Sequence, residues 1–177
     1  MQEAVIQNTS KTNLLGAAGE HFIMSELLRR GYVAALAPQG VPNTDLVVTD
    51  LSGQRLCSIQ VKSRQDKGRD GGWHMSKKHE STIGNHLFYC FVSFGNSVEV
   101  APSVYVMPSE KVAIVLAEAH IAWVTTPGNK GQQRKNTDMR RLVPDYEYAY
   151  KPNPAKYCSG WVEPYKSAWH LLGLDGD

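Results

Sequence analysis

Asp45 and the triplet Gln60-Val61-Lys62 are the residues of this chain whose types and spacing suit a chemical reaction. A carboxylate and an amide oxygen are suitable ligands for a hard divalent cation such as Mg²⁺ or Mn²⁺. A lysine beside such an ion is able to orient a water molecule and to offset negative charge on a phosphoryl group. The Asp, Gln and Lys side chains therefore outline a metal-dependent phosphodiesterase site.

Two segments rich in β-forming residues, 45–50 and 55–62, have turn-forming residues between them and predict an antiparallel hairpin. The position of the turn places Asp45 opposite Gln60, with their Cβ atoms roughly 5 Å apart. Because side chains alternate along a strand, Gln60 and Lys62 share one face. A slip of the register by one residue would send Asp45 to the other face and dismantle the site.

Residues 12–30 are predicted to form a helix, with Gly31 as its C-terminal stop. On a helical wheel the apolar face is formed by Leu14, Ala17, Met24 and Leu28. Glu20 falls on or beside this face, where a carboxylate needs a cation or a hydrogen-bond donor as its partner. Glu20 is therefore either a fourth residue of the site or an ordinary exposed glutamate at the rim of the helix.

The rest of the chain alternates between strands and helices. Strands are predicted at residues 32–37, 86–94 and 104–107, and helices at residues 109–119 and 164–172. With 177 residues and 42% hydrophobic content, we expect one domain of the α/β class, with a mixed α+β sheet. The N-terminal residues lack a basic segment followed by an apolar one, and no stretch is long enough to span a membrane, so we expect a cytoplasmic protein.

Basic residues gather in two stretches, 62–78 and 128–141, which we predict to be mobile surface loops. The net charge of +2 does not by itself indicate a nucleic-acid-binding protein. Solvated charge is the commoner explanation of one basic run, but two such loops, one beginning at Lys62, favour contacts with phosphate groups. The candidate nucleic-acid-binding residues are Ser63, Arg64, Gln65, Lys77, Lys78, Lys130, Arg134 and Lys135.

The order Gly16-x-x-Gly19-Glu20, then Asp45, then Gln60-Val61-Lys62 resembles the PD-(D/E)xK nuclease superfamily, which includes Holliday-junction resolvases and many restriction endonucleases. The resemblance covers roughly residues 13–110. It implies a restriction-endonuclease-like αβββαβ core, with a central mixed sheet flanked by helices, at about residues 13–119. Residues 120–177 are then a C-terminal extension.

The chain departs from the pattern of the superfamily in two places. Gln60 stands where the superfamily usually has Asp or Glu, and no proline directly precedes Asp45. A Gln-x-Lys variant is known among related restriction enzymes, so the change is compatible with activity, although it removes one negative charge from the metal site.

The resemblance also implies a role for each residue. Asp45 is the central ligand of Mg²⁺ or Mn²⁺, and the Gln60 side-chain oxygen and the Val61 carbonyl complete the protein ligands. Glu20 holds a metal-bound water or a second ion, and Lys62 orients the attacking water. The substrate is expected to be nucleic acid, with DNA preferred, and a homodimer is consistent with how many of these enzymes cut both strands.

Besides a nuclease, two other functions are compatible with the same residues. In the second alternative, the chain is a catalytically inactive protein of this fold that binds nucleic acid or a protein partner. In the third alternative, Asp45 and Lys62 form only a cross-strand salt bridge, which contributes less than about 1 kcal/mol when it is exposed. The nuclease ranks first, mainly because of the family resemblance.

Overall fold

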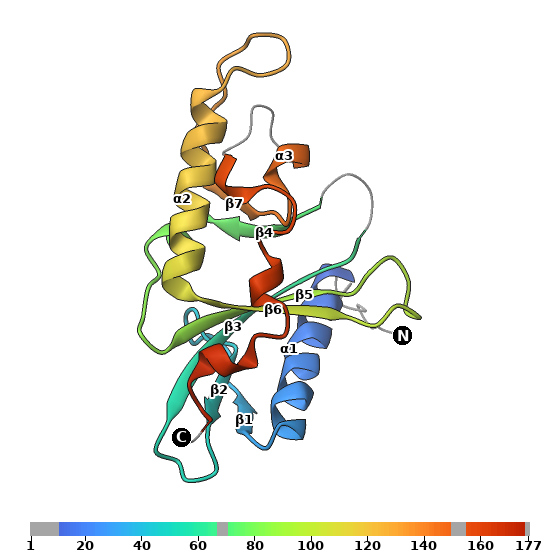
Figure 1. Cartoon of the computed structure of the whole chain (residues 1–177), viewed down its shortest axis with the longest axis vertical. Helices are drawn as coiled ribbons and strands as arrows, with labels where there is room; N and C mark the ends of the chain where they lie inside the picture. The colour runs from blue at the N-terminus through green and yellow to red at the C-terminus, as the bar shows by residue number, and fades with distance from the viewer. Residues whose placement is uncertain (1–10, 67–70, 150–154, 176–177) are drawn as a thin grey trace, which may run out of the picture.

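The centre of the computed structural model, which describes residues 11–66, 71–149 and 155–175, is a five-stranded mixed sheet (Figure 1). The strand order is β1-β2-β3-β5-β6, and only β3 and β5 pair in parallel. The bounds are β1 Val33–Leu36, β2 Leu46–Thr49, β3 Leu56–Arg64, β5 Leu87–Ser93 and β6 Ser103–Pro108. The predicted mixed α+β architecture is confirmed.

The predicted hairpin is formed by β2 and β3, and its register is confirmed. Leu46 lies opposite Ile59, and Val48 lies opposite Cys57. Continued by one residue, this register places Asp45 opposite Gln60. The backbone of Asp45 is held on both sides, because its N–H donates to the Ile59 carbonyl and its carbonyl accepts from the Ala37 N–H, both at 2.8 Å.

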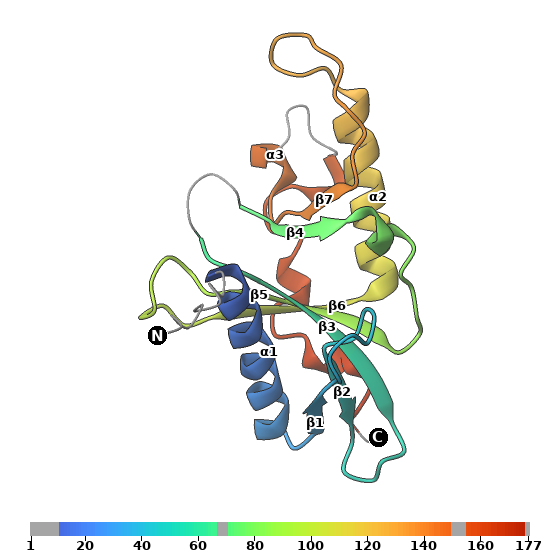
Figure 2. The same cartoon turned by 180° about the vertical axis from the view of Figure 1, so that it is seen from behind.

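One face of the sheet packs against α1 (Lys11–Arg29) and the C-terminal turn η4 (Trp169–Leu172), as Figure 2 shows for the helix. The apolar face predicted for α1 lies on the wrong side of the helix, since Leu14 and Leu28 are 60% and 49% exposed. The buried row is Gly19, Ile23 and Leu27, spaced by four residues. The helix approaches β3 most closely at Gly19, and this contact decides which row faces the sheet.

The other face of the sheet packs against α2 (Ser109–Thr125) and a second, two-stranded sheet. This small sheet pairs β4 (Trp73–Ser76) with β7 (Met139–Leu142). The two basic stretches predicted as loops therefore each contain a strand. Trp73 and Leu142 alternate with exposed residues along these strands and enter the core, which stabilises the pairing.

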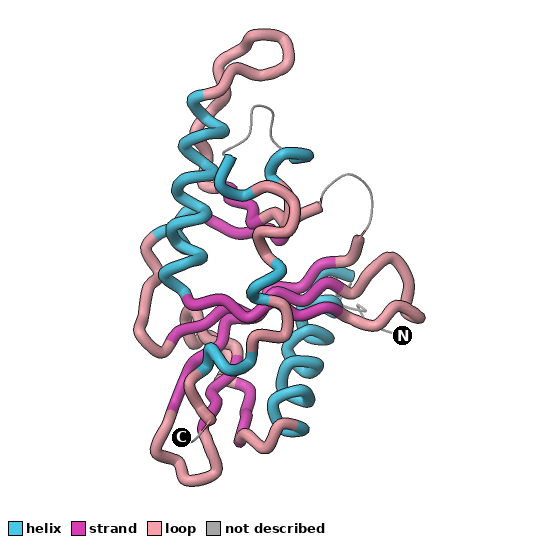
Figure 3. The backbone as a smooth tube through the Cα atoms, viewed as in Figure 1, coloured by secondary structure: helices cyan, strands magenta, loops and turns pink. Residues whose placement is uncertain are grey.

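Shorter elements complete the chain, and Figure 3 shows how they lie between long loops. They are η1 (Lys77–Glu80), α3 (Tyr146–Ala149), η2 (Ala155–Tyr157) and η3 (Glu163–Tyr165). The helix predicted at residues 164–172 is instead the two 3₁₀ turns η3 and η4, with the break at Ser167, whose φ is +49°. Trp169 and Leu172 are buried in the core that also contains residues of α1.

The connection between the parallel strands β3 and β5 contains β4 and η1, and α2 follows β6. This connection brings the first basic stretch back across the sheet, so that η1 lies close to the Lys62 side of β3 and contacts α2. Within the described ranges, no helix combines the length and the apolar character needed to cross a membrane.

Candidate active site

The side chains of Asp45 and Gln60 meet at the start of β2, where the hairpin register places them. Asp45 Oδ2 accepts a hydrogen bond from the Gln60 side-chain amide and a second one, of 2.7 Å, from the Val61 N–H. Gln60 is only 7% exposed, so this amide is a buried polar group whose hydrogen bond matters for stability. The Asp45 carboxylate is thereby fixed against β3.

The carbonyl of Val61 points to the same side of β3 as the Asp45 carboxylate. The pair of the β2–β3 ladder nearest to Val61 is Leu46 and Ile59, so β2 does not extend beside Val61. The Val61 N–H therefore donates to the Asp45 carboxylate instead of to a carbonyl of β2. Because the N–H and C=O of one residue in a strand point to the same side, the Val61 carbonyl also faces this end of β2.

Lys62 shares the face of Gln60 and is half-buried. Burial is the main reason that its pKa lies below the ordinary lysine value, and the charge of Lys78 lowers the pKa further. The carboxylates of Asp45 and Glu20 act in the opposite direction, so both lie within electrostatic reach of the ammonium. With the residues that the structure describes, Lys62 makes no hydrogen bond or close ion pair.

Glu20 reaches the same region from α1. The preceding residue, Gly19, packs so closely on Ser63 that a Cβ at position 19 would lie 1.8 Å from the Ser63 Oγ. Burial raises the pKa of Glu20, and the nearby Asp45 carboxylate raises it further, while His21 and Lys62 partly compensate. The structure thus brings Glu20, Asp45, Gln60 and Lys62 together.

Two buried residues beside Lys62 were not expected from the sequence. His79 in η1 is 3% exposed, and its Nδ1 lies 2.8 Å from the hydroxyl of Tyr89, which pairs with Gln60 across β3 and β5. Burial, followed by the charges of Lys62 and Lys78, lowers the pKa of His79 to about 4. No pattern in the sequence points to this pair, because the register of a parallel partner strand is not encoded locally.

The residues expected to bind nucleic acid are distributed over several surfaces. Lys77 and Lys78 are exposed on η1, beside the Lys62 face, and Lys130 and Lys135 are exposed on the loop after α2. The remaining residues are engaged within the protein or lie at the end of β3. The Ser63 Oγ is buried against α1, and Gln65 is half-buried. Arg64 forms an ion pair with Asp66 and lies over the Trp73 ring. Arg134 lies over the Trp123 ring.

The donor set at this site fits a hard divalent cation better than zinc. Over the described ranges, no three His, Cys, Asp or Glu side chains come together as a metal cluster. The oxygen donors available here are instead the Asp45 and Glu20 carboxylates, the Gln60 amide and the Val61 carbonyl. Mg²⁺ and Mn²⁺ accept such oxygen sets and retain several waters, whereas structural zinc sites use nitrogen and sulfur.

The fold is similar to that of solved nucleases. The chain aligns over 93% of its length, and 92% of the other chain, with a bacterial homing endonuclease at 20% sequence identity and a TM-score of 0.50. It aligns over 92% of its length, and 98% of the other chain, with a Holliday junction resolvase from the archaeal hyperthermophile Archaeoglobus fulgidus at 14% identity and a TM-score of 0.45. No protein-family model and no curated protein matches the chain. The likeness to the homing endonuclease shows a shared fold, and the predicted restriction-endonuclease-like fold class is confirmed.

Proposed function

We propose that this chain is a metal-dependent endonuclease that hydrolyses phosphodiester bonds in DNA. The observation that carries the proposal is the arrangement of Asp45, Gln60 and Lys62 at the start of β2. A fixed carboxylate, an amide and a partly desolvated ammonium converge there. The nuclease fold of the solved neighbour supports the proposal, and the choice of DNA comes from the family resemblance.

Asp45, Gln60 and Val61 would hold the ion through a carboxylate, an amide and a carbonyl oxygen. The Gln60 amide must rotate so that its oxygen, rather than its N–H, faces the ion. When bound, Mg²⁺ or Mn²⁺ supplies Lewis-acid polarisation of the phosphoryl group and favours hydroxide as the nucleophile near neutral pH. The hydrogen bond from the Val61 N–H keeps Asp45 in place during this rotation.

Lys62 would orient the attacking water and stabilise negative charge on the phosphoryl oxygens. Its partial burial strengthens both interactions, because electrostatic effects are larger where water is excluded. Glu20, whose pKa is raised by burial and by Asp45, is suited to accept a hydrogen bond or a proton from a water in the site. The cations of Lys77 and Lys78 on η1 would bind the phosphate backbone next to the reacting group.

A nucleic-acid-binding protein without cleavage is the second candidate function, and one observation favours it. The hydrogen bond from the Gln60 amide satisfies the Asp45 carboxylate without any cation. An acid at position 60 would instead create a pair of facing carboxylates that requires a cation. Metal binding therefore separates the two candidates.

The proposal is tested by incubating labelled DNA duplexes, junctions and RNA with the protein in Mg²⁺ or Mn²⁺, and by measuring cleavage and binding in parallel. Lys62→Ala is expected to lose cleavage and to retain binding, because one phosphate contact is a small part of a backbone footprint. Lys166→Ala, a substitution of an exposed lysine in the C-terminal turns, is the matched control and should keep both properties. Salt-sensitive binding without cleavage by the wild type would favour the second candidate instead.

A further inference from the structure

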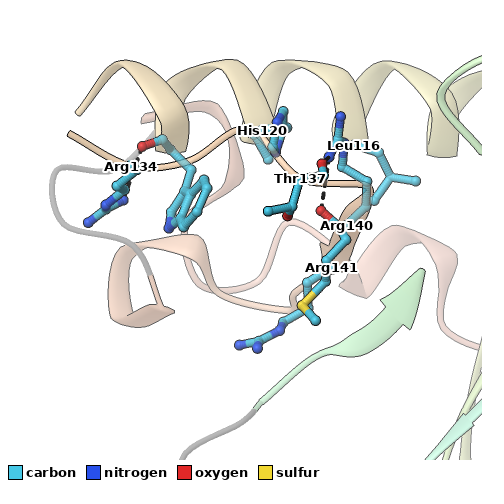
Figure 4. Close-up of a pocket in the computed structure, with 9 residues that line it drawn as sticks. Leu116, His120, Arg134, Thr137, Arg140 and Arg141 are labelled. Carbon is cyan, nitrogen blue, oxygen red and sulfur yellow. Dashed lines mark hydrogen bonds between the residues drawn. The ribbon is translucent and has the colours of Figure 1, made fainter. Parts of the chain in front are cut away.

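A cavity of about 300 Å³ lies between the C-terminal half of α2, the loop that follows it, and β7 (Figure 4). Leu116, His120 and Trp123 form the wall from α2, and Arg134 approaches from the loop. Arg141 lines the cavity from β7, with its guanidinium directed away from α2 (Figure 4). In the described part of the chain, no acidic side chain lines this cavity. Its size is at the lower end of small-ligand sites, which suits a single nucleotide.

The aromatic and cationic side chains of this cavity are held in place by contacts within the protein. The Arg134 guanidinium lies over the Trp123 ring, 5.1 Å from its centroid, and donates a 3.2 Å hydrogen bond to the Trp123 carbonyl. The His120 ring lies 5.8 Å from the Trp123 ring at an angle of 29°, and its Nε2 is 2.8 Å from the Asn136 side-chain oxygen. A preorganised wall of this kind lowers the entropy cost of ligand binding.

Two arginines of this cavity, Arg140 and Arg134, differ in whether a carboxylate of the protein neutralises their charge. Arg140 is 4% exposed and forms an ion pair with Glu80, so its charge is neutralised and its role is structural. Arg134 makes no ion pair with a carboxylate of the described residues. The cavity therefore presents an excess of positive charge next to an aromatic ring, a combination that binds both parts of a nucleotide.

The turn η1 joins this cavity to the candidate active site. Its last residue, Glu80, holds Arg140 of the cavity, and His79 and Lys78 lie beside Lys62. The turn η1 therefore interacts with residues of both regions. A nucleic-acid strand that follows η1 from Lys62 would reach the cavity.

We propose that the cavity binds one unpaired nucleotide, with its phosphate against Arg134 and its base against the wall formed by α2. This inference rests on the proposed function and adds a substrate class to it, namely nucleic acid with an extruded or unpaired base. The same chemistry is presented by a free nucleotide, and the two sources are distinguished by experiment.

The test measures binding in a chelator, so that cleavage does not interfere. The probes are a duplex with one bulged nucleotide, the same duplex fully paired, and free deoxyadenosine monophosphate. The wild type should bind the bulged duplex about tenfold more tightly than the paired one, because contacts to one additional base contribute that much. Trp123→Leu should remove this preference and leave binding of the paired duplex nearly unchanged, and Arg134→Gln should remove the preference as well.

Lys135→Gln is the matched control, since it removes a charge from the same loop outside the cavity. This variant should lower the affinity for both duplexes by the same factor and keep the preference for the bulged duplex. Equal affinity of the wild type for both duplexes would overturn the inference. The inference would also be overturned if Trp123→Leu lowered the affinity for the bulged and the paired duplex by the same factor.

Failure of the nucleotide site and failure of the proposed function give different results. If the wild type binds neither duplex, the proposed function fails. The titration with free nucleotide then decides whether the cavity binds a nucleotide. Saturable fluorescence quenching that is absent in Trp123→Leu would establish a free-nucleotide site. An absence of quenching in the wild type would overturn the cavity proposal as well. Circular dichroism and melting curves confirm that each variant is folded.

Discussion

The Asp45 carboxylate accepts a hydrogen bond from the side-chain amide of Gln60 across the β2–β3 hairpin. The neutral amide places no second negative charge on β3 beside this half-buried carboxylate. Glu20, on α1, is the other carboxylate of the site, and its pKa is already raised by burial and, to a smaller degree, by Asp45. A negative charge at position 60 would therefore add to the repulsion between the carboxylates of the site.

Gln60→Glu should bind Mg²⁺ more tightly and should be less stable in a chelator. The new carboxylate replaces the hydrogen bond by repulsion, which a divalent cation relieves. A charge added about 5 Å from the ion contributes enough for an increase in affinity of at least about tenfold. Calorimetric titration with Mg²⁺ and melting curves with and without the ion measure the two effects. An affinity equal to or weaker than that of the wild type would show that position 60 does not contact the ion.

Gly19→Ala should reduce cleavage by about 100-fold, because the added Cβ would displace α1 and Glu20 from β3. The clash is with the Ser63 Oγ, at 1.8 Å, whereas the Ser63 Cβ would be 3.1 Å away. Adding Ser63→Ala should therefore restore much of the activity in the double variant.

Gly16→Ala is the control for helix propensity, because nothing lies within 4 Å of a Cβ there. It should keep full activity and stabilise the helix by about 0.5–1 kcal/mol. A double variant of Gly19→Ala and Ser63→Ala that is as inactive as the single Gly19→Ala variant would contradict the positioning role of this contact.

The protein should lose stability as the pH falls from about 6.5 to about 4, because His79 is buried in its neutral form. The folded pKa of His79 lies below the unfolded value, so the unfolded state binds the proton first and stability is complete only above the unfolded pKa. The slope contributed by one such group is at most about 1.4 kcal/mol per pH unit. Urea unfolding across this range should show a flatter profile for His79→Gln, and an unchanged profile would exclude His79 as the source.

Removing the charges of Lys130 and Lys135 together should weaken DNA binding uniformly across sequences. Both side chains are exposed on the loop after α2, where they are available for phosphate contacts. Each lost phosphate contact lowers the slope of log K against log salt by about one, so the double Gln variant should lower it by about two. Affinity measurements over a salt series provide the slope, and an unchanged value would identify these lysines as solvated surface only.

The β2–β3 hairpin was predictable because its information is local. The turn between the strands fixes the register, and the register alone places Asp45 opposite Gln60. The phase of α1 was not predictable in the same way, because apolar residues occur on several sides of this helix. The contact of Gly19 with Ser63, more than forty residues away, selects the buried row.

Pairings between distant segments account for the other differences. β4 and β7 are separated by more than sixty residues. β4 lies within the first basic stretch and β7 begins within the second, and the composition of both stretches indicates a loop. Their strands form because Trp73 and Leu142 are buried together and because Glu80 neutralises the buried Arg140. The pair of His79 and Tyr89 depends on the connection through β4 and η1 in the same way.

Cleavage by Asp45→Asn is the most direct test of the proposed site. The substitution keeps the size of the side chain and an oxygen for the Val61 N–H, but it removes the charge that would hold the ion. Labelled DNA substrates are incubated with the wild type and the variant over a titration of Mg²⁺ and Mn²⁺, with a chelator control. We predict cleavage by the wild type only with metal and none by the folded variant, while both proteins bind DNA. Cleavage by Asp45→Asn at the wild-type rate, or cleavage by the wild type in the chelator, would contradict a metal-dependent site at Asp45.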